Sequence, residues 1–169
     1  VVGVAPVEYR QHGAFAELLA LPARILYALP PGLTYQQAAM VEPVSIAIHA
    51  VQRVKLAPNA TAVVIGAGMI GLFVVQALKW AGATRIIAVD LADNRLALAR
   101  ELGATDTLRS DLVDVPAEVA RLTGGGAEVA LEVVGISATV NLAIASVRRG
   151  GHVVLVGNLA PKIDFPLQA

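Results

Sequence analysis

The sequence predicts a doubly wound α/β fold, in which helices cover both faces of a parallel β-sheet. Short β-branched apolar runs recur along the chain, segments with helical periodicity separate them, and a glycine-rich turn joins the first run to the helix after it. Strands that are buried on both faces form continuous apolar runs. Strands that alternate with helices favour a parallel sheet with right-handed crossovers. We place the alternating pattern at about residues 61–157.

Five apolar runs and four helical segments make up this pattern. The predicted strands are residues 62–65, 85–89, 105–108, 128–134 and 152–156, and the predicted helices are residues 69–81, 93–102, 112–122 and 137–147. Asp93 is placed to cap the second helix and Gly103 to close it. The glycines at 124–126 and 150–151 are expected to end the third and fourth helices.

The region before the first predicted strand has a different pattern. Residues 34–55 predict one long helix, with Thr34 as its N-cap and a kink at Pro43. Residues 30–32 form a Pro/Gly linker, and residues 14–19 and 24–27 resemble strands of another domain.

We expect the chain to be a piece of a longer protein. It opens on Val1 without a basic leader and stops at Ala169 without a polar tail. The expected division is a tail of a preceding domain with its linker at residues 1–33, and an incomplete sheet domain at residues 34–169.

Composition excludes several classes of protein. The chain has 169 residues, is 56% apolar and carries 13 basic and 13 acidic residues, so it is neither disordered nor suited to nucleic acid. Cysteine is absent, which removes disulfides, thiolate catalysis and sulfur ligation of zinc within the chain. Residues 56–78 are uncharged, but a turn and three glycines interrupt them, so we expect no membrane span and a cytoplasmic protein.

The sequence Gly66-Ala67-Gly68-Met69-Ile70-Gly71 follows a predicted strand and opens a predicted helix. In this GxGxxG pattern the first glycine allows a tight turn, the second admits a pyrophosphate and the third lets helix and strand pack closely. Amides near Met69 and Ile70 would face the phosphates. The pattern alone is weak evidence, but its position predicts a dinucleotide site.

Asp90 strengthens this prediction, because it ends the next predicted strand 19 positions after Gly71. A carboxylate there would accept bonds from an adenosine ribose and repel a 2′-phosphate. Leu91 and the alanine after it offer no offsetting cation, so NAD is favoured over NADP. The alternative is that Asp90 only starts the following helix. Arg95 either covers the adenine face or is a solvated helix charge.

Two further strand ends are candidates for lining the cofactor, because ligands of open α/β sheets lie across the carboxyl ends of the strands. They are Val134-Gly135 and Val156-Gly157-Asn158. The alternative for each is an ordinary turn glycine.

The helix predicted at residues 34–55 contains one candidate metal contact, Glu42. Glu42 interrupts an apolar stretch, so it should meet a metal, a cation or a hydrogen-bond donor, or form a salt bridge at a domain surface. His49 lies about 10 Å further along the helix axis, too far to share one ion with Glu42. We expect His49 to be a hydrogen-bonded core residue, and His12 and His152 to lie at the surface or at strand ends.

The chain resembles the zinc-dependent medium-chain dehydrogenases, particularly their sorbitol and galactitol-1-phosphate branch. The resemblance rests on residues 13–17, the Glu42-Pro43 motif, the turn at 66–71 and residues 156–158. It implies a Rossmann domain joined to a GroES-like catalytic domain. A zinc ion would polarise the alcohol while a hydride passes to NAD.

The resemblance also implies roles for individual residues. Glu42 would be a zinc-proximal carboxylate, and Val44 and Ile46 would lie near the nicotinamide, with the other zinc ligands upstream of Val1 and the last strand beyond Ala169. The implied protein is a dimer or tetramer that acts on a small alcohol or polyol. The chain alone would bind NAD weakly and lack activity. A zinc-free quinone reductase, an S-adenosylmethionine-dependent methyltransferase and a regulatory nucleotide sensor are the alternatives.

Overall fold

The computed structural model describes residues 13–165 of the chain. The chain divides into two compact units, Val1–Glu42 and Pro43–Ala169, and each is described by itself. Among the described residues, no helix is both long enough and apolar enough to cross a bilayer.

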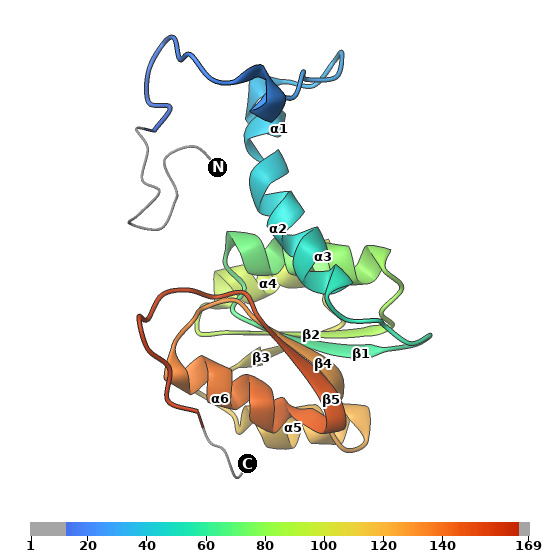
Figure 1. Cartoon of the computed structure of the whole chain (residues 1–169). Helices are drawn as coiled ribbons and strands as arrows, with labels where there is room; N and C mark the ends of the chain where they lie inside the picture. Colours follow the sequence, from blue (N-terminus) through green and yellow to red (C-terminus); the bar gives the residue numbers. More distant parts are fainter. Residues whose placement is uncertain (1–12, 166–169) are drawn as a thin grey trace. The chain divides into compact units, whose positions relative to one another are not determined.

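The second unit is built on a five-stranded sheet (Figure 1). Its strands are β1 (Thr61–Ile65), β2 (Arg85–Asp90), β3 (Asp106–Arg109), β4 (Ala127–Glu132) and β5 (Val147–Leu155). All pairings are parallel and the order is β3-β2-β1-β4-β5. The order reverses direction on either side of β1, which confirms the predicted doubly wound, Rossmann-type sheet.

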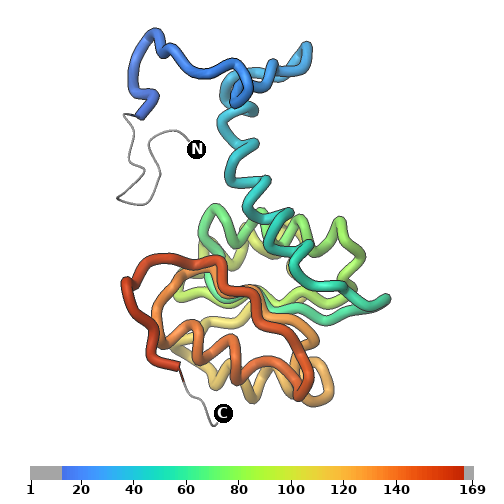
Figure 2. The backbone as a smooth tube through the Cα atoms, in the orientation of Figure 1, coloured from blue at the N-terminus to red at the C-terminus, as the bar shows by residue number. Residues whose placement is uncertain are grey.

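Helices cover both faces of this sheet (Figures 1 and 2). The helices α3 (Met69–Trp80) and α4 (Asp93–Leu102) lie on one face, and α5 (Val115–Thr123) and α6 (Ser137–Ser146) lie on the other. Successive residues of β1 point to opposite faces, so Val64 packs with Val75 in one core while Val63 packs with Val119 in the other. Both sides of the central strand are therefore dry.

The sequence predicted where α4 and α5 end but not where they begin. Helix α5 begins at Val115 after the N-cap Asp114, and not at residue 112 as predicted. Gly103 closes α4 with a φ of 125°, and Gly124 closes α5 in the left-handed conformation. The N-cap of α4, however, is Ala92, and Asp93 is the first helical residue. The prediction that Asp93 caps this helix was wrong because the chain turns into the helix one residue earlier.

The prediction that Gly150 and Gly151 end a helix was also wrong. Helix α6 ends at Ser146 and β5 begins at the next residue. Ala127 of β4 pairs with Val147 of β5, and the next pair is Val129 with His152. Between these pairs β5 has more residues than β4, so β5 contains a β-bulge. Gly150 takes a φ of 76° inside this bulge. These glycines therefore serve an irregular strand and not a helix cap.

The long helix expected at residues 34–55 is two helices, α1 (Tyr35–Ala39) and α2 (Val41–Gln52). Pro43 explains the break, because a proline ring clashes with the carbonyl four residues earlier, and that residue is Ala39. The break therefore precedes the proline, which lies in the first turn of α2. Thr34 is the N-cap of α1 as predicted, and its hydroxyl accepts a bond from the amide of Gln37 at 3.2 Å.

The strands expected at residues 14–19 and 24–27 are not formed. The described residues upstream of the linker contain one short 3₁₀ helix, η2 (Ala23–Ile25). A strand needs a hydrogen-bonding neighbour, and none is present in this segment. The large side chains of Phe15, Leu18 and Tyr27 are exposed.

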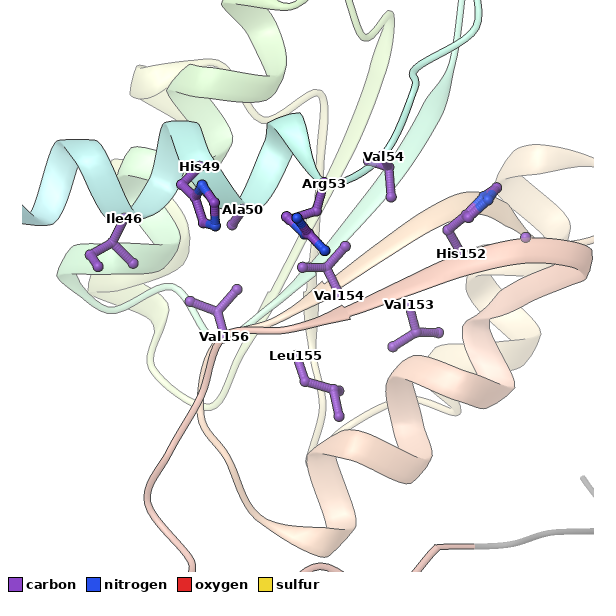
Figure 3. A pocket seen from close by; sticks show the side chains of 11 residues that line it. Ile46, His49, Ala50, Arg53, Val54, His152, Val153, Val154, Leu155 and Val156 are labelled. Carbon is purple, nitrogen blue, oxygen red and sulfur yellow. The ribbon is translucent and has the colours of Figure 1, made fainter. Parts of the chain in front are cut away.

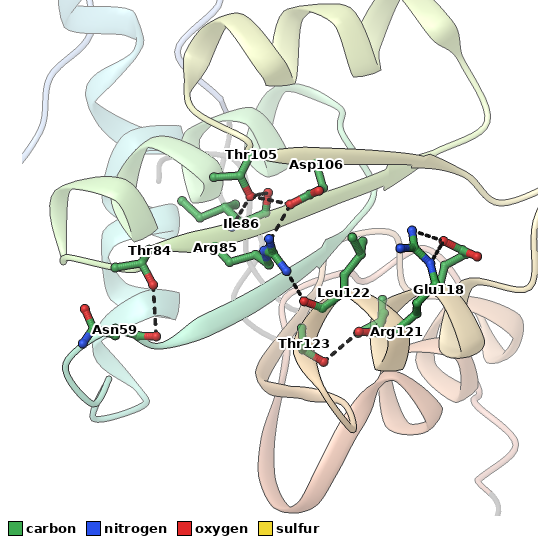
Figure 4. A network of polar contacts seen from close by, with 11 residues as sticks. Asn59, Thr84, Arg85, Ile86, Thr105, Asp106, Glu118, Arg121, Leu122 and Thr123 are labelled. Atoms are coloured by element: carbon green, nitrogen blue, oxygen red, sulfur yellow. Dashed lines mark hydrogen bonds and ion pairs between the residues drawn. The ribbon is translucent and has the colours of Figure 1, made fainter.

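A polar network ties the amino-terminal ends of β2 and β3 to the end of α5 (Figure 4). The guanidinium of Arg85 lies 3.5 Å from the Asp106 carboxylate and donates to the carbonyl of Leu122. The hydroxyl of Thr105 accepts from the amide of Ile86 at 3.0 Å. This network fixes the sheet edge at the end opposite to the strand ends that carry the candidate site.

The first prediction concerns the cap of α5. The Asp114 carboxylate accepts from the amide of Ala117 at 3.1 Å, so Asp114→Ala should lower the free energy of unfolding by about 1 kcal/mol. Urea titration measures the change. Asp114→Asn keeps an acceptor oxygen and is the matched control, so an equal loss in both variants would contradict the capping role.

Candidate functional site

A cavity of about 500 Å³ lies where β1, β2 and β4 end. We call it the strand-end cavity. Its lining comes from the last residues of β1 and β2, from the loops that follow the strands, and from α4 and α6, as the topology of a doubly wound sheet requires. Its lining residues are Ile65, Gly66, Val89, Asp90, Leu91, Ala92, Asn94, Arg95, Ser110, Val134, Ile136, Thr139 and Leu142.

The glycine turn between β1 and α3 borders this cavity, and each of its glycines meets a different constraint. Gly66 has a φ of 99°, and a Cβ there would lie 2.7 Å from a methyl group of Val134. A Cβ at Gly71 would overlap the carbonyl oxygen of Gly66, so α3 packs backbone to backbone on the turn. A Cβ at Gly68 would meet no atom within 4 Å. The open space at Gly68 is where an added group could approach the backbone.

The amino terminus of α3 has no side-chain cap. Its N-cap is Gly68, and no side chain accepts a hydrogen bond from the first turn, which contains Met69 and Ile70. Uncapped amides and the helix dipole together favour an anion at such a position. The open Gly68 and the uncapped turn therefore fit a pyrophosphate.

Asp90 ends β2 and holds the turns on both sides of the cavity. One carboxylate oxygen accepts from the amide of Ala67 at 2.8 Å, and the other accepts from Leu91 at 2.8 Å and Ala92 at 3.0 Å. The side chain is 8% exposed. Asp90 thus binds the glycine turn to the β2–α4 turn, a role that the spacing alone did not reveal.

Arg95 lies closer to Asp90 than the sequence suggested. Its guanidinium is 3.7 Å from the Asp90 carboxylate, and its side chain is 56% exposed. The sequence offers no cation at the two positions after Asp90, but the first turn of α4 supplies one. The side chain is more than half exposed, so both the adenine-covering role and the solvated role remain open beside this pairing.

A second guanidinium stabilises the loop after β3. Arg109 lies 2.9 Å from Asp93 and 2.5 Å from Asp111, and Ser110 between them lines the strand-end cavity. The hydrogen bond from Arg109 holds the pKa of the Asp111 carboxyl below its ordinary value, and the two carboxylates raise the pKa of Arg109. The ion pair between Arg109 and Asp93 therefore ties this loop to α4.

The ends of β4 and β5 approach each other through their glycines. A Cβ at Gly157 would overlap the backbone of Val134 and Gly135, and one at Gly135 would overlap Gly157 and Asn158. The carbonyl of Gly135 accepts from the amide of Ala160 at 2.8 Å. These glycines are required by close backbone packing, which an ordinary turn glycine does not show.

Of the residues predicted to bind a cofactor, Gly66, Asp90, Leu91, Arg95 and Val134 line the strand-end cavity. Sequence reasoning missed Ser110, Ile136 and Thr139, which follow β3 and β4. Ser110 could have been found, because it lies two residues after the strand predicted at residues 105–108.

Other predicted residues lie away from this cavity. Val44 borders a groove between α2 and α3, lined also by Ile48, Phe73 and Trp80. Ile46 and Val156 line a different cavity, of about 640 Å³, between α2 and β5 (Figure 3). Within this unit, the structure does not bring Val44 and Ile46 together with the strand-end cavity.

The predictions for the three histidines have different outcomes. His49 is exposed and lines the α2–β5 cavity with Arg53 and His152, so the expectation of a core histidine was wrong (Figure 3). The buried side of α2 is formed by small residues such as Ala47 and Ala50, which leaves His49 on the other side of the helix. His152 is exposed as predicted, and His12 lies outside the described residues.

The described residues do not form a zinc site by themselves. Among residues 13–165, no group of three His, Asp or Glu side chains comes together as a metal cluster, and the chain has no cysteine. Glu42 is exposed and offers one carboxylate. One such ligand is too few for a zinc ion, which takes at least three protein ligands.

Comparison with known proteins identifies relatives of this chain. Residues 70–169 match the family model described as zinc-binding dehydrogenase. The chain is 44% identical to (R,R)-butanediol dehydrogenase of Bacillus subtilis (strain 168), with 85% of the chain and 42% of the relative covered. It is 38% identical to sorbitol dehydrogenase of the same strain, with 92% and 44% covered.

A solved structure shares the fold. A zinc-binding dehydrogenase from Sinorhizobium meliloti 1021, determined bound to NADP, superimposes with a TM-score of 0.86 at 31% identity, covering 93% of this chain and 47% of the other. The chain spans less than half the length of each of these proteins.

The second prediction tests the glycine turn. Gly71→Ala should destabilise the protein by about 1–3 kcal/mol, because its Cβ has no space against Gly66. Gly68→Ala is the matched control and should cost less than about 1 kcal/mol, since only the N-cap preference is lost. Chemical denaturation compares them, and equal stabilities would contradict the close packing of α3.

Proposed function

Because the chain belongs to the zinc-binding dehydrogenase family, we propose that it forms the cofactor-binding portion of an NAD- and zinc-dependent alcohol or polyol dehydrogenase. One observation carries the cofactor assignment. The Asp90 carboxylate at the end of β2 binds the Ala67 amide of an uncapped glycine turn. This arrangement places an acidic group beside an anion site, which suits a dinucleotide with a ribose and a pyrophosphate.

The proposed NAD site extends over the carboxyl ends of the strands. The pyrophosphate would lie at the Gly68 space, the adenosine ribose at Asp90, and the nicotinamide half toward β4 and β5. Bound NAD supplies a hydride acceptor; the chain binds and orients it. The proposed contacts are Gly66, Gly68, Met69, Ile70, Gly71, Asp90, Leu91, Arg95, Val134, Gly135, Val156, Gly157 and Asn158, with Val44 and Ile46 near the nicotinamide.

Zinc is proposed to bind elsewhere in the protein. The described residues supply too few ligands, so Glu42 would at most approach a zinc ion held by residues outside them. We propose a small alcohol or polyol as substrate, since two relatives are named for butanediol and sorbitol. We also propose that the full-length protein is a homodimer or homotetramer in the cytoplasm.

The third prediction separates this function from a methyltransferase, whose S-adenosylmethionine also binds beside a glycine-rich turn. Full-length protein containing this chain should be stabilised by NADH and unaffected by S-adenosylmethionine. Thermal unfolding with each ligand measures the difference. Stabilisation by S-adenosylmethionine alone would reject the dehydrogenase proposal. In that case, adding a polyol and NAD to the protein should produce no NADH absorbance.

The fourth prediction concerns cofactor choice. Asp90→Ala removes the ribose acceptor and should weaken NAD about tenfold or more, while NADP, which loses a repulsion, should change much less. Isothermal titration of both cofactors measures this. Equal weakening would show that Asp90 acts only by holding the amides of Ala67, Leu91 and Ala92.

Arg95 is a proposed contact with a half-exposed side chain, and it provides the comparison. Arg95→Ala removes the cation beside Asp90 and should weaken NAD by no more than about threefold, because an exposed charge contributes little. If Arg95→Ala instead abolished a preference for NADP, the assignment of NAD as the cofactor would be wrong.

A further inference from the structure

Glu132, the last residue of β4, is a carboxylic acid with no exposed surface. It lies where β4 runs beside Ile65 of β1 and Leu155 of β5, at the strand ends that face the proposed cofactor. An acidic side chain is rarely buried completely without a specific partner. The contacts of Glu132 show what the partner is.

Glu132 accepts four backbone amides. Its side-chain oxygen Oε1 accepts from Val134 at 2.8 Å and from Gly135 at 2.7 Å. Its main-chain carbonyl accepts from Val156 at 2.8 Å and from Gly157 at 3.0 Å. One residue therefore holds both of the turns that leave β4 and β5.

These turns have little freedom to move independently. The backbone of Gly157 packs directly on that of Gly135, where neither position has space for a Cβ. Val134 also packs on Gly66: a Cβ added at Gly66 would lie 2.7 Å from a methyl group of Val134. A displacement of the Val134-Gly135 turn would therefore reach both the glycine turn and the end of β5.

The second carboxylate oxygen of Glu132 has no hydrogen-bond partner among the described residues. A buried oxygen without a hydrogen-bond partner has a desolvation cost, so this oxygen does not stabilise the fold. Glu132 does not itself line the strand-end cavity, but its carboxylate holds the amide of Val134, which does. A requirement on the shape of the cavity wall would account for the cost.

We propose that Glu132 is a positioning residue for the cofactor: its carboxylate fixes Val134 and Gly135 so that the ends of β4 and β5 form one rigid wall of the NAD site. This inference rests on the proposed function. Glu132 does not touch the cofactor, since it is fully buried. It acts through the two amides that it holds.

The test uses full-length protein carrying Glu132→Leu, Glu132→Gln or Glu132→Asp. Glu132→Leu leaves two amides unpaired and should weaken NADH binding about tenfold or more. Glu132→Gln keeps an oxygen that can accept from both amides, so it should retain most of the affinity. Glu132→Asp keeps the charge on a shorter arm and should lie between them. NADH fluorescence titration measures affinity, and thermal unfolding is recorded in parallel.

Glu128 provides the matched control on the same strand. Its carboxylate accepts from the amide of Thr61 at 3.1 Å, near the opposite end of β4. Glu128→Leu should lower the melting temperature and leave NADH affinity unchanged.

In steady-state assays, Glu132→Leu should raise KM for NAD more than KM for the alcohol.

The outcomes separate the two proposals. Wild-type protein that does not bind NADH rejects the proposed function. If wild-type protein binds NADH and folded Glu132→Leu binds equally well, or Glu128→Leu loses as much affinity, the positioning role is wrong. If Glu132→Leu does not fold, Glu132→Asp decides, and wild-type affinity in that variant also rejects the role.

Discussion

The close approach of α3 to β1 is the constraint on which the candidate site depends. Because Gly71 has no side chain, the first turn of α3 lies directly on the carbonyl of Gly66, and the uncapped amides of the helix are brought to the end of the central strand. Gly68 then leaves open space beside those amides. A larger residue at Gly71 would move the helix, and with it the candidate anion site, away from the end of β1.

Two carboxylates hold the turns that follow the central strand and the strands on either side of it. The carboxylate of Asp90 accepts from Ala67 and from the turn after β2, and the carboxylate of Glu132 accepts from the turn after β4. The main-chain carbonyl of Glu132 accepts from the turn after β5. Both carboxylates bind main-chain amides of loops that no sheet ladder satisfies. They differ in exposure: the Asp90 side chain retains a small exposed area at the cavity, whereas Glu132 has none. The first is therefore placed to meet a ligand and also to hold a turn, and the second only holds turns.

Local patterns predicted the strands and helices well and failed where an element depends on its neighbour. The apolar runs and the caps at Gly103 and Gly124 follow from residue chemistry over a few positions. The bulge at Gly150 depends on the register between β4 and β5, and the exposure of His49 depends on which side of α2 packs on the core. The strands expected at residues 14–19 and 24–27 need a partner strand, and residues 13–30 of the described chain do not contain one. Such outcomes are properties of pairs of elements and cannot be derived from one of them.

The sequence by itself determined the doubly wound sheet, the position of the glycine turn and the candidate acidic residue Asp90, because each depends on periodicity or spacing along the chain. The tertiary structure decided which groups meet. It paired Arg95 with Asp90, separated Ile46 and Val156 from the strand-end cavity, and buried Glu132 at the junction of two turns. Hydrogen bonds from side chains to distant amides join residues that are far apart in sequence, so only the folded arrangement of parallel strands brings them together.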